Sequence, residues 1–231
     1  MNLDIISDAF VAHGLVVRGG FHPAQEDLVP ALPTGQPGRT VVIVGNAGPQ
    51  MWEQFARSPE RGLDRDPLNT WTRVVVSELA TNLGAEVLYP FSGPPYYPFQ
   101  RWAQRADSVW SSPIGILIHP EIGLWHGYRA ALIFEQRLAL PVRVTVDNPC
   151  DSCEERPCLN TCPVGAFTAE SYDVPSCVNF MSSQEGSNCV SLGCQARRAC
   201  PVGKSFVYDA PQAKFHQQAF LRSHTGSEVE S

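Results

Sequence analysis

The chain has 231 residues, of which 43% are hydrophobic and 17% charged, and its formal net charge is −6. This length suits one large or two modest globular domains. The acidic balance and the scarcity of lysine are atypical of nucleic-acid-binding proteins, which usually carry a basic face, so no nucleic-acid partner is expected.

The most apolar stretch, residues 114–125, is short and interrupted by His119, Pro120 and Glu121. It is too short to span a bilayer, and no membrane partner is expected. The first ten residues have no basic side chain and two acidic ones, unlike a secretory signal peptide. A cytoplasmic location is therefore expected, and there clustered cysteines indicate metal binding before disulfides.

Helical and strand patterns alternate along the first part of the chain. Strands interleaved with helices indicate an α/β or α+β layered domain. Helices are expected at residues 2–14, 66–85 and 100–110, and strands at 15–21, 39–49, 85–91, 115–120 and 129–140.

The clearest helix covers residues 66–85. Asp66 is expected to cap it, Pro67 suits its first position, and Gly84 suits the residue just past its end. Its apolar side chains fall on roughly one face, namely Leu68, Trp71, Val75, Leu79 and Leu83.

All eight cysteines lie between Cys150 and Cys200, which suggests a domain boundary near residues 147–149. Beyond about residue 209 the chain is polar and is expected to form a disordered tail. The expected organisation is a first domain at 1–148, a cysteine-rich domain at 149–208 and a polar tail at 209–231.

The cysteine region contains two related motifs. "CPVGAF" at 162–167 and "CPVGKSF" at 200–206 resemble each other, which suggests an internal duplication. In ferredoxins with two [4Fe–4S] clusters, three cysteines of one loop bind one cluster, and the cysteine of the final Cys-Pro binds the other. This pattern predicts one ligand set of Cys150, Cys153, Cys158 and Cys200, and another of Cys162, Cys177, Cys189 and Cys194.

The spacing is wider than in bacterial ferredoxins. The second gap of the first motif, between Cys153 and Cys158, holds four residues where two are usual. A single cluster, a zinc site and disulfides therefore stay open as alternatives.

The cysteine layout resembles the C-terminal ferredoxin part of epoxyqueuosine reductases and of corrinoid reductive dehalogenases. In the former, a cysteine between the motifs also supplies a ligand, as Cys177 would here. Those enzymes place cobalamin in a preceding nitroreductase-like domain. The resemblance thus implies a nitroreductase-like α/β layered domain followed by a small ferredoxin-like [4Fe–4S] module, an α+β protein as a whole.

Residues 114–133, "IGILIHPEIGLWHGYRAALI", resemble a segment of the cobalamin-processing (cblC-type) family. The resemblance implies that the matching residues contact a cofactor such as a corrinoid, and these are Gly115, His119, Gly123, Trp125 and Arg129, with Pro120 following the histidine. From the residues alone, His119 also suits a turn position satisfied by backbone. Arg129 in an apolar strand needs an anionic partner, either a ligand or an internal acid.

Two departures from these families matter. Epoxyqueuosine reductases donate a proton from an acidic residue, and the matching residues 89–97, "YPFSGPPYY", contain no acid. The cblC-type proteins carry a histidine about where Asp107 stands. Neither role transfers to this chain.

The sequence thus predicts an iron–sulfur electron-transfer protein with two [4Fe–4S] clusters. It would pass electrons to a corrinoid or another cofactor bound by the N-terminal domain, as part of a corrinoid-linked oxidoreductase. Its expected partner is an electron donor or acceptor protein. The alternative is a non-catalytic cobalamin-binding or trafficking module whose metal site is structural.

Overall fold

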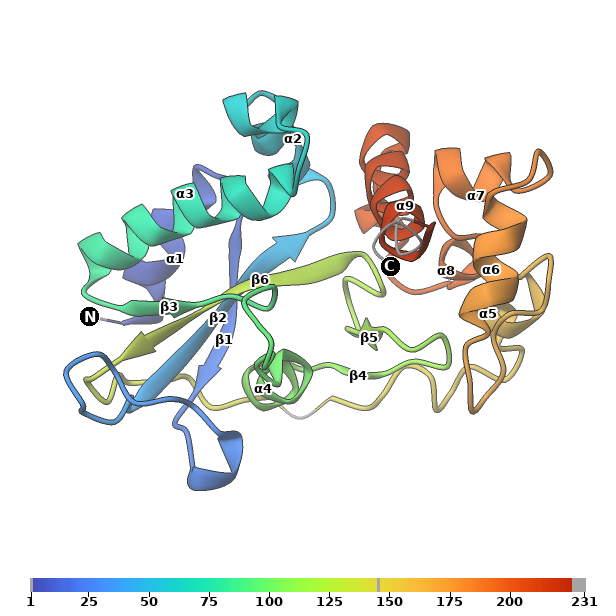
Figure 1. Cartoon of the computed structure of the whole chain (residues 1–231). Coiled ribbons are helices and arrows are strands. Elements are labelled where there is room, and N and C mark those ends of the chain that lie inside the picture. Colours follow the sequence, from blue (N-terminus) through green and yellow to red (C-terminus); the bar gives the residue numbers. More distant parts are fainter. Residues whose placement is uncertain (1, 145, 226–231) are drawn as a thin grey trace. The chain divides into compact units, whose positions relative to one another are not determined.

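The computed structural model describes residues 2–144 and 146–225 (Figure 1). They form two compact units. The first contains the chain up to Val109 together with His126–Val146, and the second contains Trp110–Trp125 and the chain from Asp147 onward. The sequence analysis placed residues 110–125 in the first domain, and the structure instead groups them with the cysteine region. None of the helices in the described ranges is long and apolar enough to cross a membrane.

A four-stranded sheet in the order β1-β2-β6-β3 forms the centre of the first unit, with every neighbouring pair antiparallel. Strands β2 and β6 are central and almost wholly buried towards the middle of the sheet, where Val42 lies opposite Leu132. The strands are β1 at Val16–Phe21, β2 at Thr40–Ala47, β3 at Glu86–Leu88 and β6 at His126–Phe134.

Helices cover both faces of this sheet (Figure 1). Val41 and Ile43 point to one face and pack with Trp102 of α4, while the residues between them point to the other face, towards α1 and α3. The helices of this unit are α1 at Leu3–Val11, α2 at Gln50–Ala56, α3 at Pro67–Leu83 and α4 at Phe99–Ala106. The structure is therefore a mixed α+β fold with a small sheet.

Helix α3 confirms the clearest expected helix but not its cap. Pro67 occupies its first turn, and Gly84 ends it with a φ of 66°. Asp66 is not the expected side-chain cap, because its own backbone is left-handed, with a φ of 45°, and its side chain makes no capping hydrogen bond. Helix α4 also ends earlier than expected, because Asp107 is extended and takes part in an ion pair described below.

The second unit is mostly helical. A short hairpin pairs β4, Trp110–Ser111, with β5, Leu117–Ile118. The helices that follow are α5 at Pro157–Asn160, α6 at Val174–Met181, α7 at Ser187–Leu192, α8 at Gln195–Ala199 and α9 at Ala210–Thr225.

Helix α9 corrects the expectation of a disordered tail from residue 209. It packs against α6 and α7, with Gln212 and Ala213 buried. The last residues of the expected tail, 226–231, lie outside the described residues.

Candidate metal centre

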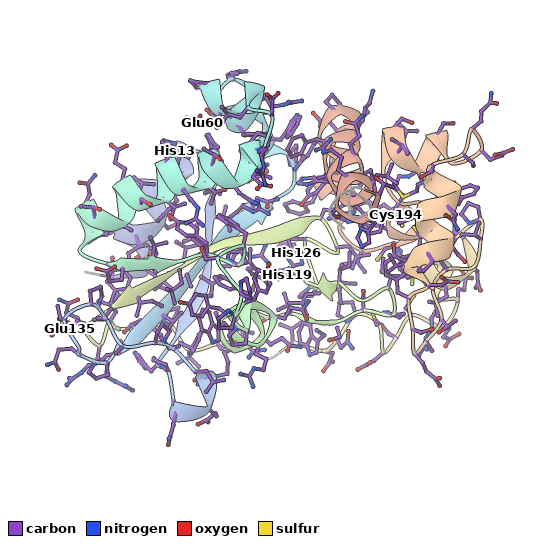
Figure 2. The ribbon with its side chains drawn as sticks, viewed as in Figure 1. His13, Glu60, His119, His126, Glu135 and Cys194 are labelled. Carbon is purple, nitrogen blue, oxygen red and sulfur yellow. The ribbon has the colours of Figure 1, made fainter. Side chains whose placement is uncertain are left out.

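The eight cysteines are free and form no disulfide among the described residues. Six of them are partly exposed, and Cys189 and Cys200 are buried. The structure divides them between two cavities of the second unit, and Figure 2 labels Cys194 among the helices of that unit.

Four cysteines line the first cavity, which has a volume of about 20 Å³: Cys150, Cys153, Cys158 and Cys200. The first two come from the turn before α5, Cys158 from α5 itself, and Cys200 from the end of α8. Helices α5 and α8 pack together, which brings the distant Cys200 to the other three. Burial, followed by the charges of the neighbouring thiols, raises the pKa of Cys150 to about 11.

The other four cysteines line a larger cavity of about 290 Å³: Cys162, Cys177, Cys189 and Cys194. Cys177 comes from α6 and Cys189 from α7, while Cys194 immediately precedes α8. Burial raises the pKa of Cys194, and the backbone N–H groups of Arg197 and Ala196 oppose the shift by donating to its sulfur.

The structure therefore brings the cysteines together in the two sets that the sequence analysis expected, including the exchange of Cys162 and Cys200 between the two motifs. In the first set, the pKa of Cys158 is raised by burial and then by Cys200 and Cys153. In the second, the pKa of Cys177 is raised by burial and then by Cys162 and Cys189. The metal-free thiols of each set thus lie close enough to disfavour one another's charge.

No three histidine, cysteine, aspartate or glutamate side chains within the described ranges surround a common point at the distances of a single metal ion. A tetrahedral zinc site would need sulfurs about 3.8 Å apart, since each Zn–S bond is about 2.3 Å. The sets of four are thus more widely spread than a zinc site requires.

The segment expected to contact a cofactor forms a closed turn in the second unit. His119 and Gly123 pair through reciprocal backbone hydrogen bonds of 2.9 Å. The Nδ1 atom of His119 accepts hydrogen bonds from the backbone N–H groups of Glu121, at 3.1 Å, and Ile122, at 3.2 Å. This is the backbone-satisfied turn position that was one of the two interpretations of His119.

The two glycines of this segment differ in their surroundings. Gly123 has a φ of 64°, and a Cβ atom there would collide with the carbonyl oxygen of Val202. Gly203 stands in the reciprocal relation to Ile122, so the turn packs backbone to backbone against the residues that follow Cys200. Gly115 has a φ of 78°, and a Cβ atom added there would meet no atom within 4 Å.

Trp125 is 2% exposed and lies against Arg197 and Tyr208 of the same unit. The Arg197 guanidinium lies 4.5 Å from the Trp125 ring centroid, and its Nε donates to the carbonyl oxygen of Leu124 at 3.1 Å. Trp125 therefore contributes to the packing of the cysteine-rich unit.

Arg129 lies on β6 in the first unit, partly buried. The fully enclosed ion pair of that unit was missed by the sequence analysis and joins Arg18 to Asp107 at 2.6 Å, with side chains 4% and 10% exposed. The Tyr128 hydroxyl also donates to Asp107, at 3.2 Å. Burial, followed by the Asp107 charge, raises the pKa of Tyr128. Arg18 sits in the apolar run "VVRGGF", so the reasoning applied to Arg129 could have found it.

Three polar side chains around the cysteines also had no signal in the spacing. Tyr172 forms a hydrogen bond with the Cys177 sulfur. Gln195 Nε2 donates to the Cys189 sulfur at 3.5 Å. Ser112 lines the first cavity with a buried hydroxyl.

No protein-family profile matches the chain, and no curated protein matches it. Solved structures do. Epoxyqueuosine reductase from Streptococcus thermophilus matches with a TM-score of 0.53 and 14% identity, over 92% of this chain and 70% of that one. The B12-trafficking protein CblC from C. elegans matches with a TM-score of 0.52 and 13% identity, over 95% and 96%. An epoxyqueuosine reductase solved with an epoxyqueuosine-modified tRNA stem loop matches with a TM-score of 0.52 and 14% identity, over 90% and 66%.

At these identities the likeness establishes the fold alone. The chain resembles in fold both kinds of protein that its sequence resembles, and it spans about two thirds of the reductases and nearly all of CblC. The tRNA belongs to the neighbour, and the absence of a nucleic-acid partner for this chain stays a prediction.

Proposed function

We propose that this chain is an iron–sulfur electron-transfer protein whose second unit binds two [4Fe–4S] clusters. The observation that carries the proposal is the division of eight free cysteines into two sets of four, each around its own cavity. Each set draws one cysteine from the motif of the other, as the ligands of two-cluster ferredoxins do.

The residues around both cavities suit such a group. Thiolate ligands of a cluster are stabilised by N–H donors, and the backbone N–H of Ala166 donates to the Cys162 sulfur at 3.3 Å. The raised pKa of Cys150 and its neighbours keeps the thiols protonated near neutral pH, so cluster binding would release protons. When bound, such clusters carry single electrons.

The proposed electron acceptor is a corrinoid or another cofactor held by the N-terminal domain. The support is the likeness in fold to CblC and to epoxyqueuosine reductases, together with the resemblance of residues 114–133. Of the five residues implied to contact the cofactor, Gly123 and Trp125 have packing roles within the second unit. His119 and Arg129 offer the side chains chemically suited to an anionic or hydrogen-bonding group.

Epoxyqueuosine reduction is not part of the proposal. The loop over residues 89–97 has no acid to donate a proton, and its Ser92 hydroxyl accepts a hydrogen bond from Arg73 at 2.9 Å. In the same loop Tyr97 stacks on the buried Trp102, with ring centroids 5.7 Å apart.

The test is purification without oxygen, followed by iron, sulfide and zinc analysis and by EPR of the dithionite-reduced protein. We expect about eight iron atoms and eight sulfides per chain. Cys158→Ser and Cys194→Ser serve as matched variants, each losing the cluster of its own set and retaining the other. Zinc in place of iron, or no metal, would contradict the proposal.

A second candidate is a non-catalytic cobalamin-binding or trafficking module. It is favoured by the nearly complete mutual coverage with CblC and by the missing acid. The metal centre would then stabilise a unit with a small apolar core. A redox titration distinguishes the candidates, because a centre that only stabilises the fold has no need to change oxidation state in an accessible range. Titration with cobalamin, followed by its visible spectrum, tests the corrinoid in either case.

A further inference from the structure

We propose that the two cluster sites are unequal, and that the site of Cys162, Cys177, Cys189 and Cys194 has the higher reduction potential because Tyr172 and Gln195 donate hydrogen bonds to its sulfurs. Electrons would then come to rest on this second site. The inference rests on the proposed function.

Every cysteine of the second site has a hydrogen-bond donor. Ala166 N–H donates to Cys162, and the N–H groups of Ala196 and Arg197 donate to Cys194. The other two donors are side chains: the Tyr172 hydroxyl on Cys177, and Gln195 Nε2 on Cys189 at 3.5 Å. Tyr172 is held in place by Phe167, whose ring stacks on it with centroids 4.5 Å apart.

The first site has fewer donors within the described residues. Backbone N–H groups serve Cys158, from its own residue and Leu159, and Cys200, from Val202. The one side-chain hydroxyl that lines this cavity belongs to Ser112, which is 8% exposed and whose Oγ has no hydrogen-bond partner among the described residues. The remaining wall is largely apolar and includes Ile114 and Ile118.

The two cavities also differ in access to solvent. The second is larger, about 290 Å³ against about 20 Å³, and its wall includes Val164 and Tyr172, which are 40% and 37% exposed. Adding one electron to a cluster places negative charge on its sulfurs. Hydrogen-bond donors and solvent both stabilise that charge and raise the potential, so the two differences act in the same direction.

The test is a redox titration of the anaerobically purified chain, followed by EPR, with a one-electron viologen mediator and dithionite as the reductant. We expect two separate couples in a protein with about eight irons. Tyr172→Phe keeps the aromatic stack and removes only the donor. It should lower the reduced-to-oxidised ratio of the upper couple about tenfold at fixed solution potential, a shift of about 59 mV for one electron. Gln195→Leu should act on the same couple.

Ser112→Ala is the matched variant at the other site, and it should lower the lower couple alone. Tyr96→Phe, at a residue 66% exposed in the first unit, should move neither. Coincident couples, or a Tyr172→Phe shift confined to the lower couple, would overturn the inference while leaving an iron-loaded electron-transfer protein. A chain without iron would instead overturn the proposed function and this inference with it.

Discussion

Arg18 and Asp107 form an ion pair enclosed by the first unit, with Tyr128 and the carbonyl oxygen of Asn46 as further partners. Removing one member of such a pair leaves the other buried without compensation, which costs about 3–5 kcal/mol. We therefore expect Asp107→Ala to lower the free energy of urea unfolding by this order. The double variant Arg18→Met, Asp107→Leu should recover much of the loss, because it removes both charges. Equal losses in the single and double variants would contradict this account.

Gly123 and Gly115 offer a matched pair of glycines with positive φ. Each would lose about 1–2 kcal/mol on substitution by alanine because the left-handed backbone disfavours a Cβ atom. Gly123→Ala should lose more, since its Cβ would meet the carbonyl oxygen of Val202, whereas that of Gly115 meets nothing within 4 Å. Thermal unfolding and iron content measure the difference, with Gly123→Ala expected to release iron near Cys200. Similar melting temperatures for both variants would rule out the backbone contact as the cause.

At this scale, sequence predicted what spacing encodes. The repeated Cys-Pro-Val-Gly motif was enough to sort the cysteines into the two sets that the structure brings together. It gave no information on Tyr172, Gln195 or Ser112, because those contacts depend on how the loops and helices pack. The cap at Asp66 was wrong because a favourable residue type does not determine its own backbone conformation.

At the scale of elements, helix α9 was hidden by its composition. Its sequence is polar and has no continuous apolar stripe, and its buried face rests on small and polar side chains such as Ala213 and Gln212. Such a helix gains its stability from tertiary packing, which local pattern does not reveal.

Helix α9 has a direct relation to the second cysteine set. His216, Gln217 and Phe220 line the larger cavity, and no α9 residue in the described part of the chain lines the smaller one. A chain ending at Asp209 should therefore retain the first cluster and lose the second, so that iron falls to about four atoms per chain. A chain ending at Thr225 is the control and should keep about eight. Retention of both clusters without α9 would show that the helix does not support the second site.

The strands of the first unit were predictable in existence and less so in extent. β2 and β6 have long apolar runs, and both were expected. In the second unit, the hairpin strands β4 and β5 are only two residues each, so the longer strand expected at 115–120 shrank to Leu117–Ile118. The turn that follows is stabilised by packing against Val202 and Gly203, which no local pattern could indicate.

At the scale of the whole molecule, the two units should differ in their dependence on metal. The first has a four-stranded sheet with helices on both faces, whereas the second has short helices and many loops around the cysteines. Removing iron with a chelator should therefore raise amide hydrogen exchange in α6, α7 and α8 and leave β2 and β6 protected. Parallel loss of protection in both units would contradict independent stability of the sheet.

The order of the units along the chain bears on how such a protein can arise or be dissected. Because Trp110–Trp125 belongs with the cysteine-rich part, the chain passes between the units three times. A fragment cut at residue 147 would thus lack the segment that supplies Ser112 and the Gly123 turn. The cysteine-rich half is therefore no portable cassette: gene fusion or domain shuffling at that point would transfer all eight sulfurs but only part of the wall that encloses them.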